Sequence, residues 1–187
     1  LNLTLNADSN NSQGGRVNVN ADINLDGGNL VVTGASFVNR ATITTANATD
    51  PADAPGGNVT VNVDNLADLG TITTDDASGN LDVTAGRMSS TGVLDIAGTT
   101  RLSSAGDITL SNTTNDFVGS MTINNGAVVS IADRGDLTVT LDTAVTSLAL
   151  NTGRDAIVDS NNAAPLNLAA STIGRNLDVT AVGNIND

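Results

Sequence analysis

The hexapeptide NLDVTA occurs twice in this chain, at residues 80–85 and again, 96 residues further on, at 176–181. A strand-like segment repeated verbatim is unusual in a globular enzyme and typical of a solenoid, in which each coil has the same structural task as the last. The repeated unit divides into five coils of about 19 residues, a length that suits one turn of a β-solenoid. The expected coil starts lie near Asn80, Thr99, Ser120, Leu137 and Ala156, and Asn176 opens the next coil.

Apolar and polar residues alternate along most of the chain, as in LNLTLNA from Leu1, RVNVNADINLD from Arg16 and NVTVNV from Asn58. This period of two predicts short strands with one buried face, and the glycine-containing pairs between them predict turns. Alternation alone leaves a β-sandwich open. Because the pattern also repeats, it favours an all-β, right-handed parallel β-helix of about ten coils of roughly 19 residues each.

The composition supports an all-β chain that forms one unit. Glu and Lys are absent, so the strong helix formers are mostly missing, while β-branched and turn-forming residues abound. We expect residues 1–187 to be a single β-helical shaft segment of a longer protein, with a loop excursion at 46–57, where Pro51 and Pro55 interrupt the alternation. Asn residues outside the turns are expected to stack on Asn of the next coil.

Charge and missing residue types exclude several functions. The net charge of −13 argues against nucleic acid and anionic membrane surfaces as partners. No apolar run approaches the ~20 residues of a membrane-spanning helix. Without His and Cys the chain lacks the usual general base, thiol nucleophile and nitrogen or sulfur metal ligands. We therefore expect no enzyme, no cofactor and no metal site; a polysaccharide-active β-helix enzyme with paired Asp residues is the catalytic alternative.

Three segments resemble repeats of the filamentous-haemagglutinin family: GGNLVVTGASF from Gly27, AGDITLSNTTNDFVG from Ala105 and STIGRNLDVTAVGNI from Ser171. The resemblance covers nearly the whole chain and is more specific for the family than for any one member. It implies a large exoprotein of Gram-negative bacteria, secreted by the two-partner route, whose right-handed β-helical fibre acts in adhesion or in a biofilm matrix. No amino-terminal secretion domain, terminal toxin or receptor-binding module is recognisable in the sequence, so what resembles the family is shaft.

The resemblance therefore implies a secreted, cell-surface-associated adhesin shaft that extends a binding region from the cell. Its expected partners are an exopolysaccharide or a host-cell receptor, together with an outer-membrane two-partner transporter for the full-length protein. No nucleic acid and no membrane insertion are expected. The main alternative is a module that binds a ligand directly.

One candidate for direct binding is the tripeptide Arg134-Gly135-Asp136. On a protruding loop, such a tripeptide can bind integrins, because the guanidinium pairs with a carboxylate and the Asp completes the coordination of a metal ion. Arg also stands beside Gly at Arg16, Arg87, Arg154 and Arg175, so the pairing is a common turn element of this chain. The tripeptide is therefore also explained as an ordinary turn followed by a strand.

The arginines that neighbour glycine could instead form a ladder that recognises acidic polysaccharide. The competing interpretation is local pairing with Asp, as of Arg154 with Asp155, and a surface pair of this kind contributes ~0–1 kcal/mol. Calcium would have oxygen ligands at Asp75-Asp76 and at Asp50 and Asp53, but the calcium β-roll repeat and the EF-hand loop are both missing.

Overall fold

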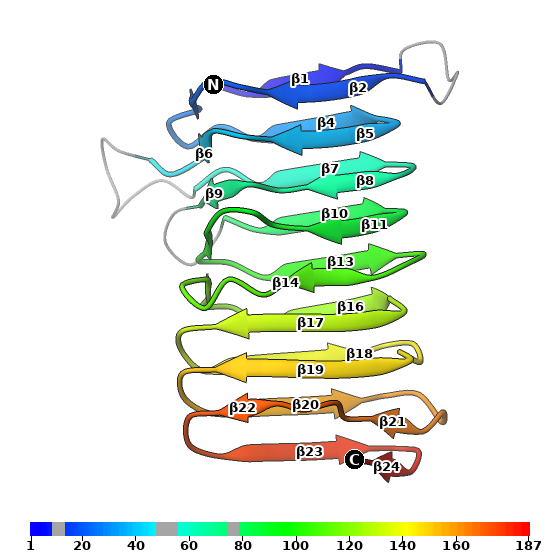
Figure 1. Ribbon diagram of the computed structural model, residues 1–187. Helices are drawn as coiled ribbons and strands as arrows, with labels where there is room; N and C mark the ends of the chain where they lie inside the picture. Colours follow the sequence, from blue (N-terminus) through cyan, green and yellow to red (C-terminus); the bar gives the residue numbers. More distant parts are fainter. Residues whose placement is uncertain (9–13, 48–55, 75–78) are drawn as a thin grey trace.

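The computed structural model describes residues 1–8, 14–47, 56–74 and 79–187 of this chain. These residues form a parallel β-solenoid: short strands stack coil upon coil along one axis, and the described residues include no helix (Figure 1). Every strand pairing in the described ranges is parallel, as in β4 with β7 and β17 with β19. Parallel pairing throughout excludes the β-sandwich that alternation alone left open.

Three stacked sheets form the sides of the solenoid, and we call them sheets A, B and C. Sheet A consists of β1 (Leu3–Asn6), β4 (Leu30–Gly34), β7 (Val59–Val63), β10 (Leu81–Ala85), β13 (Thr100–Ser104), β16 (Met121–Asn125), β18 (Leu137–Leu141), β20 (Ala156–Ser160) and β23 (Leu177–Ala181). Sheet B consists of β2 (Arg16–Val19), β5 (Ser36–Asn39), β8 (Leu66–Asp68), β11 (Arg87–Ser89), β14 (Ile108–Leu110), β17 (Val128–Asp133), β19 (Ser147–Thr152) and β22 (Thr172–Ile173).

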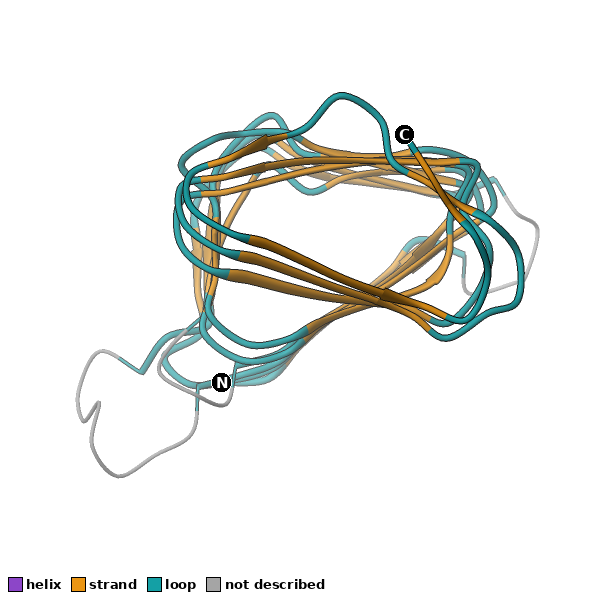
Figure 2. Cartoon of the chain, turned by 90° about the horizontal axis from the view of Figure 1, so that it is seen from below, coloured by secondary structure: helices purple, strands orange, loops and turns teal. Residues whose placement is uncertain are grey.

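The third side changes along the axis. Sheet C consists of β3 (Ile23–Asn24), β6 (Thr42–Thr44), β9 (Thr71–Thr73), β12 (Leu94–Ile96) and β15 (Asp116–Phe117). It ends at β15, and a separate pair, β21 (Leu166–Asn167) with β24 (Ile185–Asn186), forms near the C-terminal end. Viewed along the axis, the strands of successive coils superpose on the sides of the cross-section (Figure 2).

The number of coils differs from the expectation. Sheet A has nine strands, which correspond to about eight turns, so the expected count of about ten is not confirmed. Between the two NLDVTA copies the expected coil starts fall within one residue of the sheet A strands. The difference arises near the N-terminus, where equivalent residues of the first coils lie 27, 29 and 22 residues apart, compared with 19 between Asn80 and Thr99.

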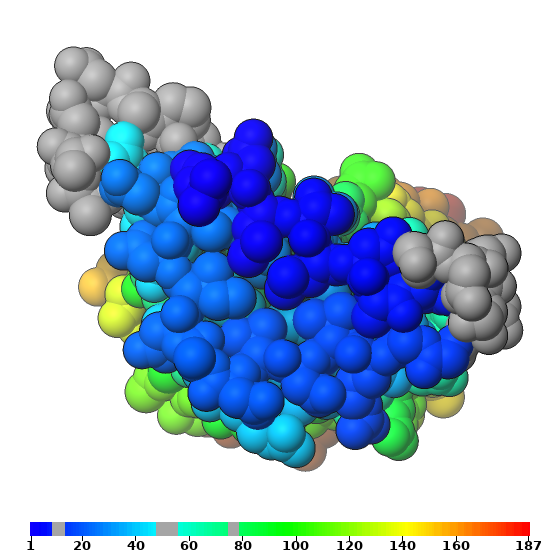
Figure 3. Space-filling model, turned by 90° about the horizontal axis from the view of Figure 1, so that it is seen from above, coloured from blue at the N-terminus to red at the C-terminus, as the bar shows by residue number. Residues whose placement is uncertain are grey.

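The core is a set of apolar columns that run parallel to the axis. In sheet A, Val61, Val83, Leu102 and Ile123 are register partners in successive coils, and each is at most 1% exposed. Burying apolar side chains against those of the coils above and below provides the main driving force for this stacking. Viewed from the N-terminal end, atoms of the first coils cover the end of the solenoid (Figure 3).

Hydrogen bonds join the described residues on either side of residues 48–55 and of residues 75–78. Most of the expected excursion at 46–57 lies outside the described residues, but its base is defined: the Thr45 hydroxyl donates to the Gly57 carbonyl at 2.6 Å, and the Gly57 N–H donates to the Thr45 carbonyl at 3.0 Å. Thr74 makes a similar bond to Gly79, at 2.8 Å, on either side of residues 75–78. An insertion at such a point leaves the coil register unchanged.

Candidate functional site

A ladder of polar residues runs along the corner that precedes sheet A. Each of the nine sheet A strands is immediately preceded by Asn, Asp, Ser or Thr, at positions 2, 29, 58, 80, 99, 120, 136, 155 and 176. The Asn29 Oδ1 accepts the backbone N–H of Asn58 at 2.8 Å, and the Asn80 Oδ1 accepts that of Thr99 at 2.8 Å. The expected stacking of Asn is therefore present, although the side chains accept mainly backbone N–H groups of the next coil.

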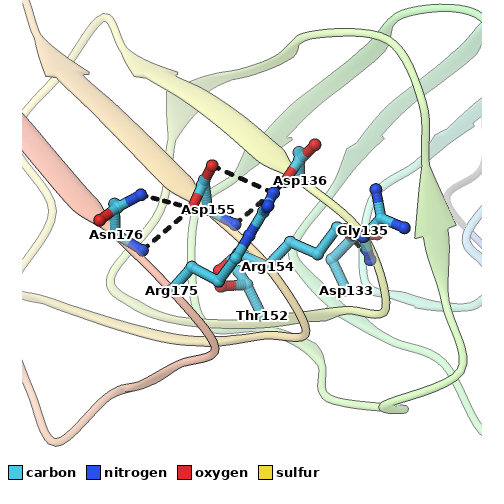
Figure 4. A network of polar contacts seen from close by, with 8 residues as sticks. All are labelled: Asp133, Gly135, Asp136, Thr152, Arg154, Asp155, Arg175 and Asn176. Atoms are coloured by element: carbon cyan, nitrogen blue, oxygen red, sulfur yellow. Dashed lines mark hydrogen bonds and ion pairs between the residues drawn. The ribbon is translucent and has the colours of Figure 1, made fainter.

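The candidate tripeptide lies on this corner, in the turn between β17 and β18. Asp136 occupies the ladder position, and its Oδ1 accepts the backbone N–H of Asp155 at 3.0 Å (Figure 4). Arg175, two coils away, contacts the carboxylates of Asp136 and Asp155, both at 3.2 Å. The hydrogen bond from Asp155 and then the charge and hydrogen bond of Arg175 lower the pKa of Asp136 below its ordinary value.

Arg134, the other charged residue of the tripeptide, also forms an ion pair within the solenoid. The Arg134 guanidinium donates to the Asp116 carboxylate of the previous coil, although Arg134 remains 59% exposed. An integrin would need both the Arg134 guanidinium and the Asp136 carboxylate, and both groups here join neighbouring coils. The structure thus accounts for the tripeptide by contacts within the solenoid.

The ion pairs cross between coils, in contrast to the expected local pair of Arg154 with Asp155. Arg134 pairs with Asp116 and Arg175 pairs with Asp136 and Asp155, whereas Arg154 enters no ion pair with the described residues. This arrangement follows from the stacking, which brings corner residues that are about 20 positions apart in the sequence to within about 5 Å of one another in adjacent coils.

A groove of about 430 Å³ lies beside the tripeptide, where sheet C ends. Asp116, Val118, Arg134, Gly135, Asp136 and Arg154 line it. The coil that follows β15 passes from β17 to β18 through a short turn and has no strand of sheet C. We call this place the step, comprising β15 and residues 133–136.

Asp133 closes the exposed edge of β15 at the step. Its side chain is 2% exposed, and its carboxylate accepts the N–H groups of Phe117 and Gly135, both at 2.8 Å. Burial raises the pKa of Asp133, outweighing these two donors, which lower it. The Asp133 side chain thus accepts the Phe117 N–H, which the next strand of a longer sheet would otherwise accept.

Asp95 adds a third carboxylate near the step. It is the register partner of Asp116 in the adjacent coil. Burial raises the pKa of Asp95, the charge of Asp116 raises it further, and Arg134 lowers it. Sequence reasoning missed this grouping, since the three carboxylates come from positions about 20 residues apart.

A second groove, of about 370 Å³, lies at the corner of sheets A and B. Arg16, Ser36, Asp64, Asn65, Leu66, Gly86 and Arg87 line it. Arg16 pairs in register with Ser36, and Leu66 pairs with Arg87, so the two arginines face one groove from different coils. Neither arginine enters an ion pair with the described residues. The sequence analysis identified both arginines as neighbours of glycine, but it could not show that they lie in the same groove.

The expectations about metals and membranes can be compared with the described residues only in part. The acidic pairs Asp50/Asp53 and Asp75-Asp76 lie outside them. Among the residues that are described, no group of three or more carboxylates is arranged to hold a metal ion. Within the same ranges there is no helix long and apolar enough to cross a membrane.

Comparison with known proteins gives one partial match. Residues 56–124 are similar to a family described as repeats of unknown function (DUF5649). The matched part runs from just before β7 to near the end of β16. No curated protein and no solved structure matches the chain.

Proposed function

We propose that this chain is a shaft segment of a large secreted bacterial adhesin of the filamentous-haemagglutinin type. It forms a right-handed parallel β-helix, carries no catalytic centre or cofactor, and extends a binding region away from the cell surface. A two-partner transporter in the outer membrane exports the full-length protein. Right-handedness is supported by the strong preference for right-handed crossovers between parallel strands.

The observation that carries this proposal is the repetition of one structural unit along the axis. Successive coils present the same inward apolar column and the same corner ladder, as at Asn58 and Asn80. Adding a coil therefore lengthens the rod by about 4.8 Å without requiring a new core. A protein whose length is its function needs such a unit.

Deleting residues 81–99, one whole coil, should leave a folded and functional shaft. The deletion joins Asn80 to Thr100, so an Asn again precedes a strand of sheet A. We expect cooperative unfolding of the purified variant and, in the native host, antibody labelling on intact cells with attachment within about twofold of the parent.

A deletion of residues 81–90 is the matched control, because half a coil disrupts the register and should abolish folding. Labelling of the parent protein only after cell lysis would contradict secretion. Loss of attachment by the whole-coil variant while it remains on the cell surface would mean that this segment binds the target itself.

The paired arginines favour a second candidate function, contact with acidic polysaccharide through the groove of Arg16 and Arg87. Two cations that form no ion pair with the described part of the chain, on either side of Ser36 and Leu66, could bind carboxylates of a uronate chain by charge-assisted hydrogen bonds. Asp64 also lines the groove and offsets one of the two positive charges, whereas more distant exposed charges are screened beyond about 8 Å at physiological ionic strength.

The double variant R16Q/R87Q should weaken retention on immobilised polygalacturonate by at least about tenfold, since two charge-assisted contacts are lost. Surface plasmon resonance at low and physiological salt measures this effect, with neutral dextran as the reference surface. The variant R40Q/R101Q removes the same charge from outside the groove and should bind like the parent. Equal weakening by both variants, or no binding by the parent, would rule out the groove as the site.

A further inference from the structure

The step differs from the rest of the solenoid in its charge balance. Asp95, Asp116 and Asp133 come from three successive coils, and Arg134 is the cation that faces them. Asp95 lies on β12, Asp116 on β15 and Asp133 at the end of β17, while Thr73 of β9, the other register partner of Asp95, is uncharged. The charge of Arg134 thus acts on all three carboxylates, while Asp136 and Arg154 line the same groove.

The step is also the place where sheet C ends, because, among the described residues, β15 has no partner strand in the following coil. Each sheet C strand from β3 to β12 pairs with the sheet C strand of the following coil. The free edge of β15 is held instead by the Asp133 side chain and by the hydrogen bond from the Arg134 N–H to the Asn115 carbonyl, at 2.8 Å. Fewer backbone hydrogen bonds across this contact make local opening easier than within the continuous part of the sheet.

We propose that the step is a joint that mild acid strengthens: loss of negative charge from Asp95 and Asp133 holds β15 and the 133–136 turn together more firmly. At neutral pH, the cost of burying the two charged carboxylates, together with their smaller repulsion by Asp116, favours opening of this contact. Proton uptake by Asp95 and Asp133 removes both effects, while Arg134 stays paired with Asp116. The inference does not depend on the adhesin proposal.

The direction of the effect follows from linkage. The pKa of Asp95 and that of Asp133 are raised above the ordinary value of 3.8. A group with a raised folded-state pKa contributes stability that is complete below the unfolded value and is lost as the pH rises through the folded value. The contribution of Asp136 to stability depends on pH in the opposite direction. Because the pKa of Asp136 is lowered, this contribution is present above pH 3.8 and is lost in stronger acid. The strengthening is therefore expected as the pH falls from neutral toward 3.8 but not below it.

Residue-resolved hydrogen exchange by NMR tests this joint directly. Each amide rate is divided by the intrinsic rate at the same pH, about 7.5 or about 4.5. We expect the protection of the Phe117 and Arg134 amides to rise by about threefold to tenfold at the lower pH, because the closed step then no longer carries the cost of burying two charged carboxylates. The Leu81 amide, within continuous sheet A, should change less and is the internal reference.

The variant D95N should already show increased protection at about pH 7.5 and a smaller response to acid. Asp95 makes no side-chain hydrogen bond with the described residues, so this substitution is expected to leave the fold intact. D82N removes one charge from the outer face of β10 and should retain the full response. The proposal is overturned if the Phe117 and Arg134 amides respond no more than Leu81, or if D95N and D82N respond alike.

Discussion

Replacing Asn115 with leucine is expected to lower the free energy of unfolding by about 3–5 kcal/mol, since buried groups left without hydrogen bonds cost about 1–3 kcal/mol each. Asn115 is fully buried and joins three coils. Its Nδ2 donates to the carbonyls of Leu110 and Ala132, at 3.1 and 3.3 Å, and its Oδ1 accepts the N–H of Leu94 at 2.9 Å. Leucine keeps the branched shape of the side chain but satisfies none of these groups.

The variant N62L is the matched control. Asn62 lies on the exposed face of β7, and the same substitution there should change stability by less than about 0.5 kcal/mol. Chemical denaturation monitored by circular dichroism measures both variants. Similar midpoints for N115L and N62L would refute the bridging role of Asn115.

Truncating Phe117 to alanine is expected to cost about 3–5 kcal/mol, the usual range for a buried aromatic residue replaced by alanine. Phe117 is one of two aromatic residues in the chain, is 1% exposed, and lies in β15, the last strand of sheet C. The cavity would remain because the surrounding columns are held in register by the sheets on either side. Thermal and denaturant unfolding measure the loss.

Val118 gives an internal comparison, because it directly follows Phe117 and faces outward. It is 67% exposed, so V118A should change the unfolding free energy by less than about 0.5 kcal/mol. If F117A and V118A were equally mild, the packing at the end of sheet C would be looser than the structure indicates.

Much of the fold could be predicted from the alternation and the repeats. A period of two identifies inward residues locally, so Val17, Val19 and the apolar residues of NVTVNV are correctly expected in the core. The coil count was less predictable, because loops at the corners lengthen the first coils without altering the strand pattern. Corner insertions cost little when the ends of the loop meet, as Thr45 and Gly57 do.

The candidate sites were less predictable than the fold. Arg134, Gly135 and Asp136 stand out as a tripeptide, yet their contacts are with Asp116, Asp155 and Arg175 of other coils. The corner ladder has a local signal, a polar residue before each alternating segment. The groove of Arg16 and Arg87 has no such signal, because its formation depends on the lengths of the coils between the two arginines.

The two NLDVTA copies show which features follow from the local sequence and which depend on neighbouring coils. Both copies form the same five-residue strand of sheet A, β10 and β23, each preceded by an Asn at the corner. Strand formation and the choice of inward face follow from the local alternation of side chains, so identical sequences give identical strands. Burial is not local: Leu81 is 1% exposed between two neighbouring strands, whereas Leu177 is 44% exposed on a strand with one neighbour. In a solenoid the core of each coil is completed by the coils on either side, and no segment contains that information by itself.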